Sequence, residues 1–197
     1  MGTCRALSDD EIKLALGCVS GRNSARDLAL FTLGLNTGFR ISEILSLNLA
    51  NVYQYGRVVD RITVQRKNMK GKDAGRSMPL NPHARQILGE YVKLLTDTGY
   101  SLDIPLFFVY YRGVKRMTRK QAWAVLHKVF ARAELDGSLG THTMRKTFAR
   151  VMFAAVDYRI EKLQRLLGHK WLNTTVQYIA NIDEGLDATV LSTCIGA

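Results

Sequence analysis

The sequence predicts an α+β fold, mostly helical, with a small antiparallel β-hairpin that becomes a three-stranded sheet if a later apolar segment adds an edge strand. Apolar residues recur at helical spacing over most of the chain. Residues 57–65 instead alternate and are rich in valine and isoleucine, a turn follows at 70–75, and residues 76–80 form the predicted returning strand. With 197 residues and 47% apolar content, the chain is expected to form one compact domain.

The segment before the hairpin is predicted to be helical. Ser8 is expected to cap a helix that runs to about residue 19, because carboxylates follow it in the first turn. Ser24 is expected to cap a second helix, whose dense apolar residues indicate that it is largely buried. Gly38 ends that helix, and Arg40 lies at the start of the next one.

Helices also dominate the chain after the hairpin. Pro82 opens one of them, and the apolar residues 106–109 are the candidate edge strand. Thr118 is expected to cap a long amphipathic helix with a basic side. Three more helices are predicted, at about residues 143–155, 159–167 and 174–179.

The charge of the chain points to a polyanionic partner. Lysine and arginine outnumber aspartate and glutamate by 28 to 17, which gives a net charge of +11. Residues 112–132 carry seven basic side chains and no carboxylate, so the charge is locally concentrated as a phosphate-binding surface requires. Nucleic acid is the first candidate partner, although each basic run taken alone is better explained as a solvated helix face.

The cysteines and the N-terminus indicate a cytoplasmic protein. Cys4, Cys18 and Cys194 are odd in number and lack the spacing of a disulfide framework or a zinc site. The first residues do not form a basic segment followed by an apolar one, and no apolar run is long enough to span a membrane. The expected location is the cytoplasm, in association with the nucleoid.

Two motifs in the C-terminal half carry side chains suited to binding an anion. His142 and Arg145 lie three residues apart at the start of a helix, so their side chains project from one face. His169 follows the expected helix end at Gly168, and the turn after it allows Tyr178 to fold back toward the histidine. Taken alone, the first pair is more typical of an ordinary surface or core contact, and Tyr178 of an ordinary half-buried aromatic residue.

Nearer the N-terminus, Glu43 lies one turn after Arg40 and can orient its guanidinium group. In this order and context, the three motifs resemble the tyrosine recombinases, also called the phage integrase family. The resemblance spans about residues 7–178, and the boxes that carry it are residues 37–45, 141–149 and 166–169, the last leading to residues 175–178.

The resemblance implies a site that cleaves a phosphodiester. Arg40 and Arg145 would donate paired N–H groups to the non-bridging oxygens, and His169 would add a third donor. Tyr178 would be the nucleophile, forming a 3′-phosphotyrosyl link and releasing a 5′-hydroxyl. His142 would accept the phenolic proton or position the phosphate. No metal or ATP is expected, because side chains supply the positive charge and the ester stores the bond energy.

The same resemblance implies a lysine near the hairpin turn that protonates the leaving 5′-oxygen. Lys70 is assigned this role and Lys72 is the second candidate, with the alternative left open that both only contact the DNA backbone. Binding of DNA should be largely electrostatic, through the hairpin and the basic helix. The expected DNA-contacting residues are Lys67, Lys72, Arg76, Arg116, Arg119 and Lys120.

A single catalytic domain is expected over residues 1–197, with a core at 7–180, a tail at 181–197 and no N-terminal core-binding domain. The expected partner is double-stranded DNA, on which the family implies a homo-tetramer, with a monomer or weak oligomer in free solution. The tail would pack against a neighbouring protomer or fold back in cis. Integration, excision and dimer resolution stay open as the natural reaction.

Two other functions are compatible with these residues. A type IB topoisomerase uses the same attack but relaxes supercoils alone, and the spacing of nine residues between His169 and Tyr178 favours a recombinase over it. A non-catalytic DNA-binding module is the alternative from a different class. The presence of suitable residues at all six expected catalytic positions argues against such a module.

Overall fold

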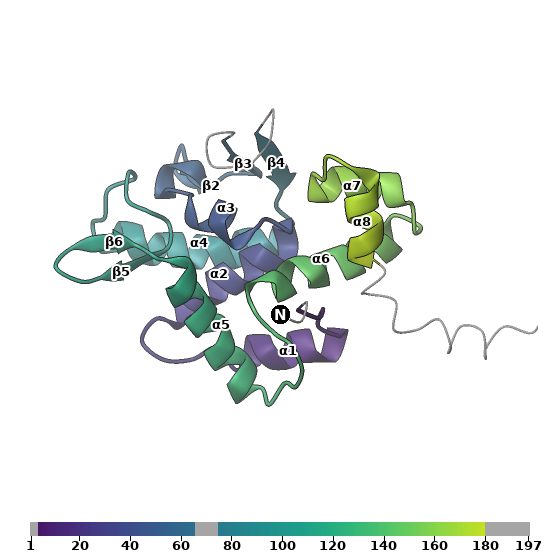
Figure 1. The fold of residues 1–197 in the computed structure, drawn as a ribbon. Coiled ribbons are helices and arrows are strands. Elements are labelled where there is room, and N and C mark those ends of the chain that lie inside the picture. Colours follow the sequence, from purple (N-terminus) through teal and green to yellow (C-terminus); the bar gives the residue numbers. More distant parts are fainter. Residues whose placement is uncertain (1–3, 66–74, 180–197) are drawn as a thin grey trace, which may run out of the picture.

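The structure, a computed structural model, describes residues 4–65 and 75–179, and most of these residues are helical (Figure 1). The helices are α1 (Asp9–Gly17), α2 (Ser24–Thr37), α3 (Ile41–Leu45), the 3₁₀ helix η1 (Leu49–Asn51), α4 (Pro82–Asp97), α5 (Arg119–Arg132), α6 (Thr141–Ala155), α7 (Ile160–Leu167) and α8 (Leu172–Ile179). The strands are β1 (Tyr53–Gln54), β2 (Arg57–Val58), β3 (Arg61–Val64), β4 (Arg76–Pro79), β5 (Phe108–Tyr110) and β6 (Val114–Arg116). The predicted α+β class, mostly helical with small antiparallel sheets, is confirmed.

The strands pair only with their neighbours in the chain. Within the described residues they form three two-stranded antiparallel ladders, β1–β2, β3–β4 and β5–β6, rather than one three-stranded sheet. The predicted strand at 57–65 is divided into β2 and β3, because the chain leaves the extended conformation at Val59 and Asp60. The expected edge strand near residues 106–109 begins later, as β5, and pairs with β6 instead of the hairpin. In the hairpin itself, the predicted strands do pair, with Val64 opposite Arg76.

Helix caps follow the predictions at two places and differ at a third. Ser8 caps α1, since its hydroxyl accepts from the backbone N–H of Glu11 and the Glu11 carboxylate accepts from the N–H of Ser8. Thr118 caps α5 in the same manner. Ser24 is the first residue of α2 and not its cap, because Asn23 precedes the helix and makes no side-chain capping bond.

Helix α2 lies at the centre of the fold, packed between α4 and α6. Its C-terminal half approaches α6 so closely that two positions leave no room for a side chain. A Cβ atom at Gly34 would lie 2.3 Å from the Met144 sulfur, and one at Gly38 would lie 2.3 Å from Cδ1 of Phe148. Gly38 also has a φ of +57°, in the left-handed region that favours glycine. The end of α2 is therefore fixed against α6.

Helices α7 and α8 lie beside α6, at the end of the molecule opposite the β5–β6 hairpin (Figure 1). Gly168 ends α7 with a φ of +62°, as predicted, and the chain then turns so that α8 packs on α7 and α6. This turn places the motif at residues 166–178 against α6, the helix that carries His142 and Arg145. None of the helices within the described ranges is both long enough and apolar enough to cross a membrane.

Candidate active site

Arg40 lies in the short connection between α2 and α3, where its orientation is set by Glu43. The Glu43 carboxylate is only 2% exposed and accepts from both the backbone N–H of Arg40, at 2.9 Å, and its Nη1, at 3.0 Å. The Arg40 side chain remains 37% exposed. One edge of its guanidinium is thus held by a buried carboxylate, while the group still reaches the surface.

Arg145 projects from the first turns of α6 into the protein and is 2% exposed. Its Nη1 donates to the carbonyl of Gly38 at 2.5 Å, and its Nη2 donates to the carbonyl of Leu167 at 2.8 Å. Nη2 also lies 3.0 Å from Nε2 of His169. Arg145 therefore links the three predicted motifs, because its partners come from the end of α2 and from the turn after α7.

Burial and like charge act on Arg145 in the same direction. Removal from water and the nearby charge of Arg40 lower the pKa of Arg145 to about 10. The guanidinium remains protonated at neutral pH. The influence of Arg40 also indicates that the two arginines lie in one electrostatic neighbourhood, as a shared phosphate ligand would require.

Arg76, expected from the sequence to contact DNA, is instead 7% exposed and lies inside the protein. Its Nη2 donates to the carbonyls of Thr37, at 2.9 Å, and of Leu166, and its Nη1 donates to Gly38 at 3.3 Å. Nη1 also lies 3.7 Å from the Glu43 carboxylate. Nη1 and Nη2 of Arg76 thus bond to the protein itself, whereas its Nε is buried without a hydrogen-bond partner among the described residues. The expected contact of Arg76 with DNA stays a prediction.

His169 is held by two hydrogen bonds in the turn between α7 and α8. Nε2 lies 3.0 Å from Nη2 of Arg145, and Nδ1 lies 3.0 Å from the hydroxyl of Thr175, which is fully buried. Since the guanidinium can only donate, Nε2 accepts in a neutral ring and the proton lies on Nδ1, pointing to Thr175. Thr175 was not among the residues predicted for the site, although it falls within the third motif.

Tyr178 folds back from α8 onto His169, as the turn at Gly168 predicts. The two rings meet edge to face, with centroids 5.5 Å apart and an interplanar angle of 71°. The Tyr178 hydroxyl is buried and has no hydrogen-bond partner among the described residues. A buried hydroxyl with an unused donor is costly unless something else binds it, so this oxygen is available to a ligand that enters the site.

The environment of Tyr178 keeps its phenol protonated. Burial raises the pKa of Tyr178 to about 12, and the positive charges of Arg145 and Arg40 oppose that shift without cancelling it. Attack by this oxygen therefore needs a nearby group that accepts the proton.

His142 lies on the outer face of α6 and is exposed. Partial desolvation lowers the pKa of His142, and the positive charges of Arg145, Arg40, Arg119 and Lys146 lower it further. At neutral pH the imidazole is thus uncharged and has a nitrogen lone pair available to accept a proton.

Lys146 is a site residue that the sequence analysis did not identify. Its side chain is 5% exposed, and its ammonium nitrogen lies 5.7 Å from the centroid of the Tyr178 ring. The position directly after Arg145 was the available signal, but a lysine in an amphipathic helix is ordinarily assigned to the solvent.

The remaining predicted residues divide into two groups. One group lies outside the described residues: Lys67, Lys70 and Lys72. The assignment of Lys70 or Lys72 as the general acid therefore stays a prediction. Arg116 donates to the carbonyls of Leu45 and Leu47 and to the side chain of Asn48, so its guanidinium ties the β5–β6 hairpin to the segment after α3. Arg119 and Lys120 are exposed at the N-terminus of α5, where Arg119 is close enough to His142 to affect its pKa.

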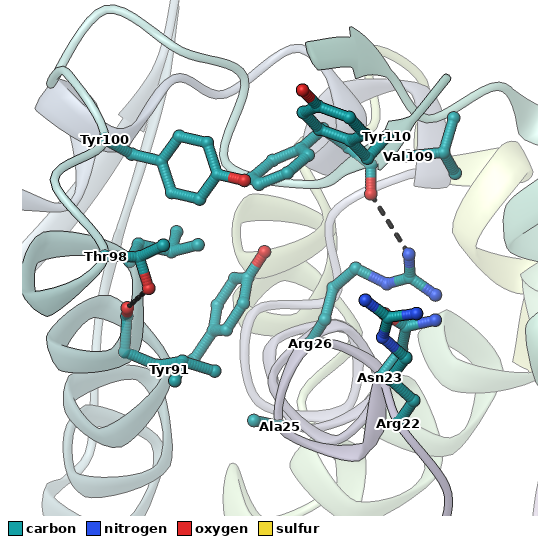
Figure 2. A pocket seen from close by; sticks show the side chains of 12 residues that line it. Arg22, Asn23, Ala25, Arg26, Tyr91, Thr98, Tyr100, Val109 and Tyr110 are labelled. Atoms are coloured by element: carbon teal, nitrogen blue, oxygen red, sulfur yellow. Dashed lines mark hydrogen bonds between the residues drawn. The ribbon is translucent and has the colours of Figure 1, made fainter. Parts of the chain in front are cut away.

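A cavity of about 950 Å³ lies elsewhere, between α4, the start of α2 and the β5–β6 hairpin. Figure 2 shows Arg26 directed toward the hairpin, where its guanidinium donates to the carbonyl of Phe108 at 3.0 Å. The hydroxyl of Tyr91 at the cavity wall donates to the carbonyl of Leu106. None of the catalytic residues predicted from the sequence lines this cavity. Its polar groups already serve the packing of the hairpin, and we assign it no chemistry.

The described part of the chain contains no cluster of three or more histidine, cysteine, aspartate or glutamate side chains arranged to hold a metal ion. The charged groups that converge on Tyr178 are instead cations. Arginine and histidine side chains around a buried phenol form an arrangement suited to an anionic ligand with several oxygens.

The fold and this arrangement define the class of the protein. The chain resembles the solved structure of XerA recombinase with a TM-score of 0.77, covering 99% of this chain and 68% of that one at 23% identity. It resembles a Tn1549 transposon integrase, solved in complex with circular intermediate DNA, with a TM-score of 0.68, covering 98% of this chain and 66% of that one at 19% identity. The fold is therefore that of tyrosine recombinase catalytic domains.

The model of the phage integrase family matches residues 5–184, and the chain belongs to that family. It is 30% identical over 179 residues to a tyrosine recombinase XerC from Caldanaerobacter subterraneus subsp. tengcongensis, covering 90% of this chain and 47% of that protein. It is 33% identical over 179 residues to a tyrosine recombinase XerD from Corynebacterium glutamicum, covering 87% of this chain and 55% of that protein. The chain thus spans about half the length of these relatives.

Proposed function

We propose that this chain is the catalytic part of a site-specific DNA recombinase that cleaves and rejoins strands through a 3′-phosphotyrosyl link at Tyr178. The observation that carries the proposal is the buried hydroxyl of Tyr178, a residue whose ring meets His169 edge to face and whose pKa is affected by the charges of Arg145 and Arg40. The catalytic unit in this proposal is residues 7–180, followed by the tail at 181–197.

Phosphate binding in this mechanism falls to the arginines. Arg40 presents a half-exposed guanidinium that Glu43 orients, and Arg145 presents a buried one fixed by carbonyls. Their forked N–H groups match the non-bridging oxygens, whose negative charge grows as phosphorus becomes pentacoordinate. His169 stands next to Arg145 and would donate to the same oxygens when its ring is doubly protonated.

The lowered pKa of His142 and the raised pKa of Tyr178 support a proton transfer from the tyrosine to the histidine in this mechanism. The phenolic proton of Tyr178 passes to His142, which is uncharged at neutral pH, as the phenolic oxygen forms a bond to phosphorus. The bond from phosphorus to the 5′-oxygen breaks, and Lys70, or Lys72 in its place, supplies a proton to that leaving oxygen. Reversal of these steps on a different 5′-hydroxyl rejoins the strand without ATP, and the side-chain cations act where other enzymes use a metal.

Double-stranded DNA is the proposed substrate, bound by a homo-tetramer that forms on the DNA from monomers or weak oligomers. The net charge of +11 and the exposed side chains of Arg119 and Lys120 support an electrostatic interface, and the charge of Arg119 reaches His142. The similar Tn1549 integrase was solved with DNA, and two relatives are described as tyrosine recombinases. We place this activity in the cytoplasm, at the nucleoid, in the setting of chromosomal or mobile-element recombination.

The decisive experiment is a suicide duplex that traps the covalent intermediate. The protein should form an adduct that survives denaturation and disappears in Tyr178→Phe, while Tyr158→Phe, which changes an exposed tyrosine, retains it. An adduct that persists in Tyr178→Phe would reject the assigned nucleophile. Relaxation of supercoiled DNA without strand exchange between two duplexes would assign the chain to the topoisomerases, and binding with no adduct would assign it to non-catalytic DNA-binding modules.

A further inference from the structure

Lys146 is an unusual residue in the interior of this protein. Its side chain is 5% exposed, yet it forms no ion pair with a carboxylate among the described residues. A charge carried by a side chain that is buried as a whole is favoured by an interaction partner close to it. The contact that the structure provides is the face of the Tyr178 ring, 5.7 Å from the ammonium nitrogen to the ring centroid.

This distance is within the range of a cation–π interaction, in which the negative face of an aromatic ring attracts a cation. The attraction is directional, so it favours the ring orientation in which the face points toward the lysine. It also grows when the phenol loses its proton, because the negative charge of a phenolate spreads over the ring. A cation placed against the ring therefore favours the ionised form in addition to holding the ring.

Other charged and titratable groups also face Tyr178. Arg145 lies on α6, Arg40 precedes α3, His169 precedes α8 and Cys4 belongs to the N-terminal segment. Of these groups, Arg145 donates to backbone carbonyls and Arg40 pairs with Glu43. Lys146 differs from these two arginines, because the contact that the described structure shows for its charge is with the Tyr178 ring.

We propose that Lys146 is a positioning residue for Tyr178, holding the phenol ring by a cation–π contact and favouring the ionised ring during attack. The inference rests on the proposed function for its catalytic part, because it assumes that Tyr178 is the nucleophile. Its structural part, the coupling between the ammonium group and the ring, stands without DNA cleavage. Two measurements separate these parts.

The first measurement is a double-mutant cycle on thermal stability, in free protein. Lys146→Met removes the charge at similar volume, and Tyr178→Leu removes the ring. The Tm change caused by Lys146→Met should be more favourable in the Tyr178→Leu background by ~2–4 °C, because the ammonium has then lost its partner. The same cycle with Tyr158→Leu, at an exposed tyrosine, should show no such difference. The proposal would be overturned if Lys146→Met changed the Tm equally in the unmodified protein and in the Tyr178→Leu variant.

The second measurement is the rate of covalent adduct formation on the suicide duplex as a function of pH. Lys146→Met should slow the reaction ~10-fold or more at pH 7.5, and the defect should shrink as pH rises and the phenol ionises more easily. Lys146→Arg should restore most of the rate, and Lys93→Met, at an exposed lysine of α4, should match the unmodified protein. A defect that is constant at every pH would overturn the role in ionisation.

The outcomes also distinguish this inference from the proposed function. If the unmodified protein forms a Tyr178-dependent adduct but Lys146→Met reacts with the same rate and pH profile, the Lys146 inference fails alone. If the protein forms no such adduct under any condition, the proposed function fails, and the thermal cycle still decides whether Lys146 holds the ring.

Discussion

Arg76 and Arg145 donate hydrogen bonds to the same acceptor, the backbone carbonyl of Gly38, at 3.3 and 2.5 Å. Two guanidinium groups thus share one buried oxygen, and the charge of Arg145 affects the pKa of Arg76. Burial, followed by the charge of Arg145, lowers the pKa of Arg76 to about 9. The carbonyl of Gly38 is available to both because the chain turns there with a positive φ. The turn between α2 and α3 therefore holds two guanidinium groups, those of Arg76 and Arg145, close to Arg40.

We expect Arg76→Met to destabilise the fold by about 3 kcal/mol, since it leaves the carbonyls of Thr37 and Leu166 without their side-chain donor and removes the buried cation next to Glu43. Arg76→Lys should recover little, because a lysine cannot reproduce the fork that bonds to Thr37, Gly38 and Leu166. Urea denaturation measures both effects.

A matched control for that experiment lies on the neighbouring strand. Arg61 on β3 is exposed, and its Nε lies 3.3 Å from the hydroxyl of Ser77. Arg61→Met should change the free energy of unfolding by less than about 0.5 kcal/mol. If the Arg76 and Arg61 variants were equally stable, the internal role of Arg76 would be refuted and a surface contact would be the better assignment.

Tyr178 should make the stability of the protein depend on pH in the alkaline range. Its pKa is raised from 10.0 to about 12 on folding, so the folded state binds the phenolic proton more tightly than the unfolded state does. The corresponding stability is fully present below pH 10 and is lost as pH rises toward 12. The free energy of unfolding should therefore fall more steeply above pH 10 in the unmodified protein than in Tyr178→Phe.

Urea denaturation at pH 8 and at pH 10.5 measures this difference. Tyr91 is a useful comparison, because burial also raises its pKa and Tyr91→Phe should likewise flatten the alkaline slope. Tyr158→Phe, at an exposed position, serves as the control. Parallel slopes for the unmodified protein and Tyr178→Phe would show that the phenol is not shielded from water.

His142 should titrate below its ordinary pKa of 6.5, because desolvation and four nearby cations disfavour the imidazolium. Removing one of those cations in Arg119→Gln should raise the titration midpoint by a few tenths of a pH unit, whereas Lys128→Gln, further along α5, should leave it unchanged. Ring-proton chemical shifts followed by NMR report the midpoint directly. A midpoint above 6.5 would remove the argument that His142 is ready to accept a proton at neutral pH.

The sequence identifies the cationic residues of the site better than their partners. The turn after α7 brings Tyr178 and His169 close to Arg145. That turn could be predicted, because Gly168 is a typical residue at a helix end. The same local reading assigned Arg76 to DNA, since its neighbours in the chain are basic. Its partners in the structure belong to turns that lie 38 to 90 residues away, and no local pattern contains them.

The fold shows the same division between local and distant information. Caps at Ser8 and Thr118 depend on side chains three residues away and were predictable. The pairing of β5 with β6 required a turn at Arg112 and Gly113, both with positive φ, which the apolar pattern of residues 106–109 does not signal. Lys146 was missed because helical periodicity does not reveal that α6 is covered on so many sides.

Thr175 should control the orientation of His169, and replacing it tests whether that orientation matters for cleavage. The Thr175 hydroxyl accepts from Nδ1, which keeps the proton there and leaves Nε2 facing Arg145. Thr175→Val preserves the shape of a fully buried side chain but removes the acceptor, so the ring can change tautomer and turn. We expect the adduct to form ~10-fold more slowly while DNA affinity is unchanged.

The neighbouring residue Thr174 supplies the control, because it lies on the same turn of α8 but is exposed. Thr174→Val should react at the rate of the unmodified protein. The hydroxyl would be dispensable if Thr175→Val reacted equally fast, and a loss of DNA binding together with the rate would point to general unfolding of α8. A rate defect confined to Thr175→Val, with native thermal stability and affinity, would establish that the hydrogen bond to Nδ1 acts through the position of His169, because the Thr175 hydroxyl bonds to the nitrogen of that ring and not to the phenol oxygen.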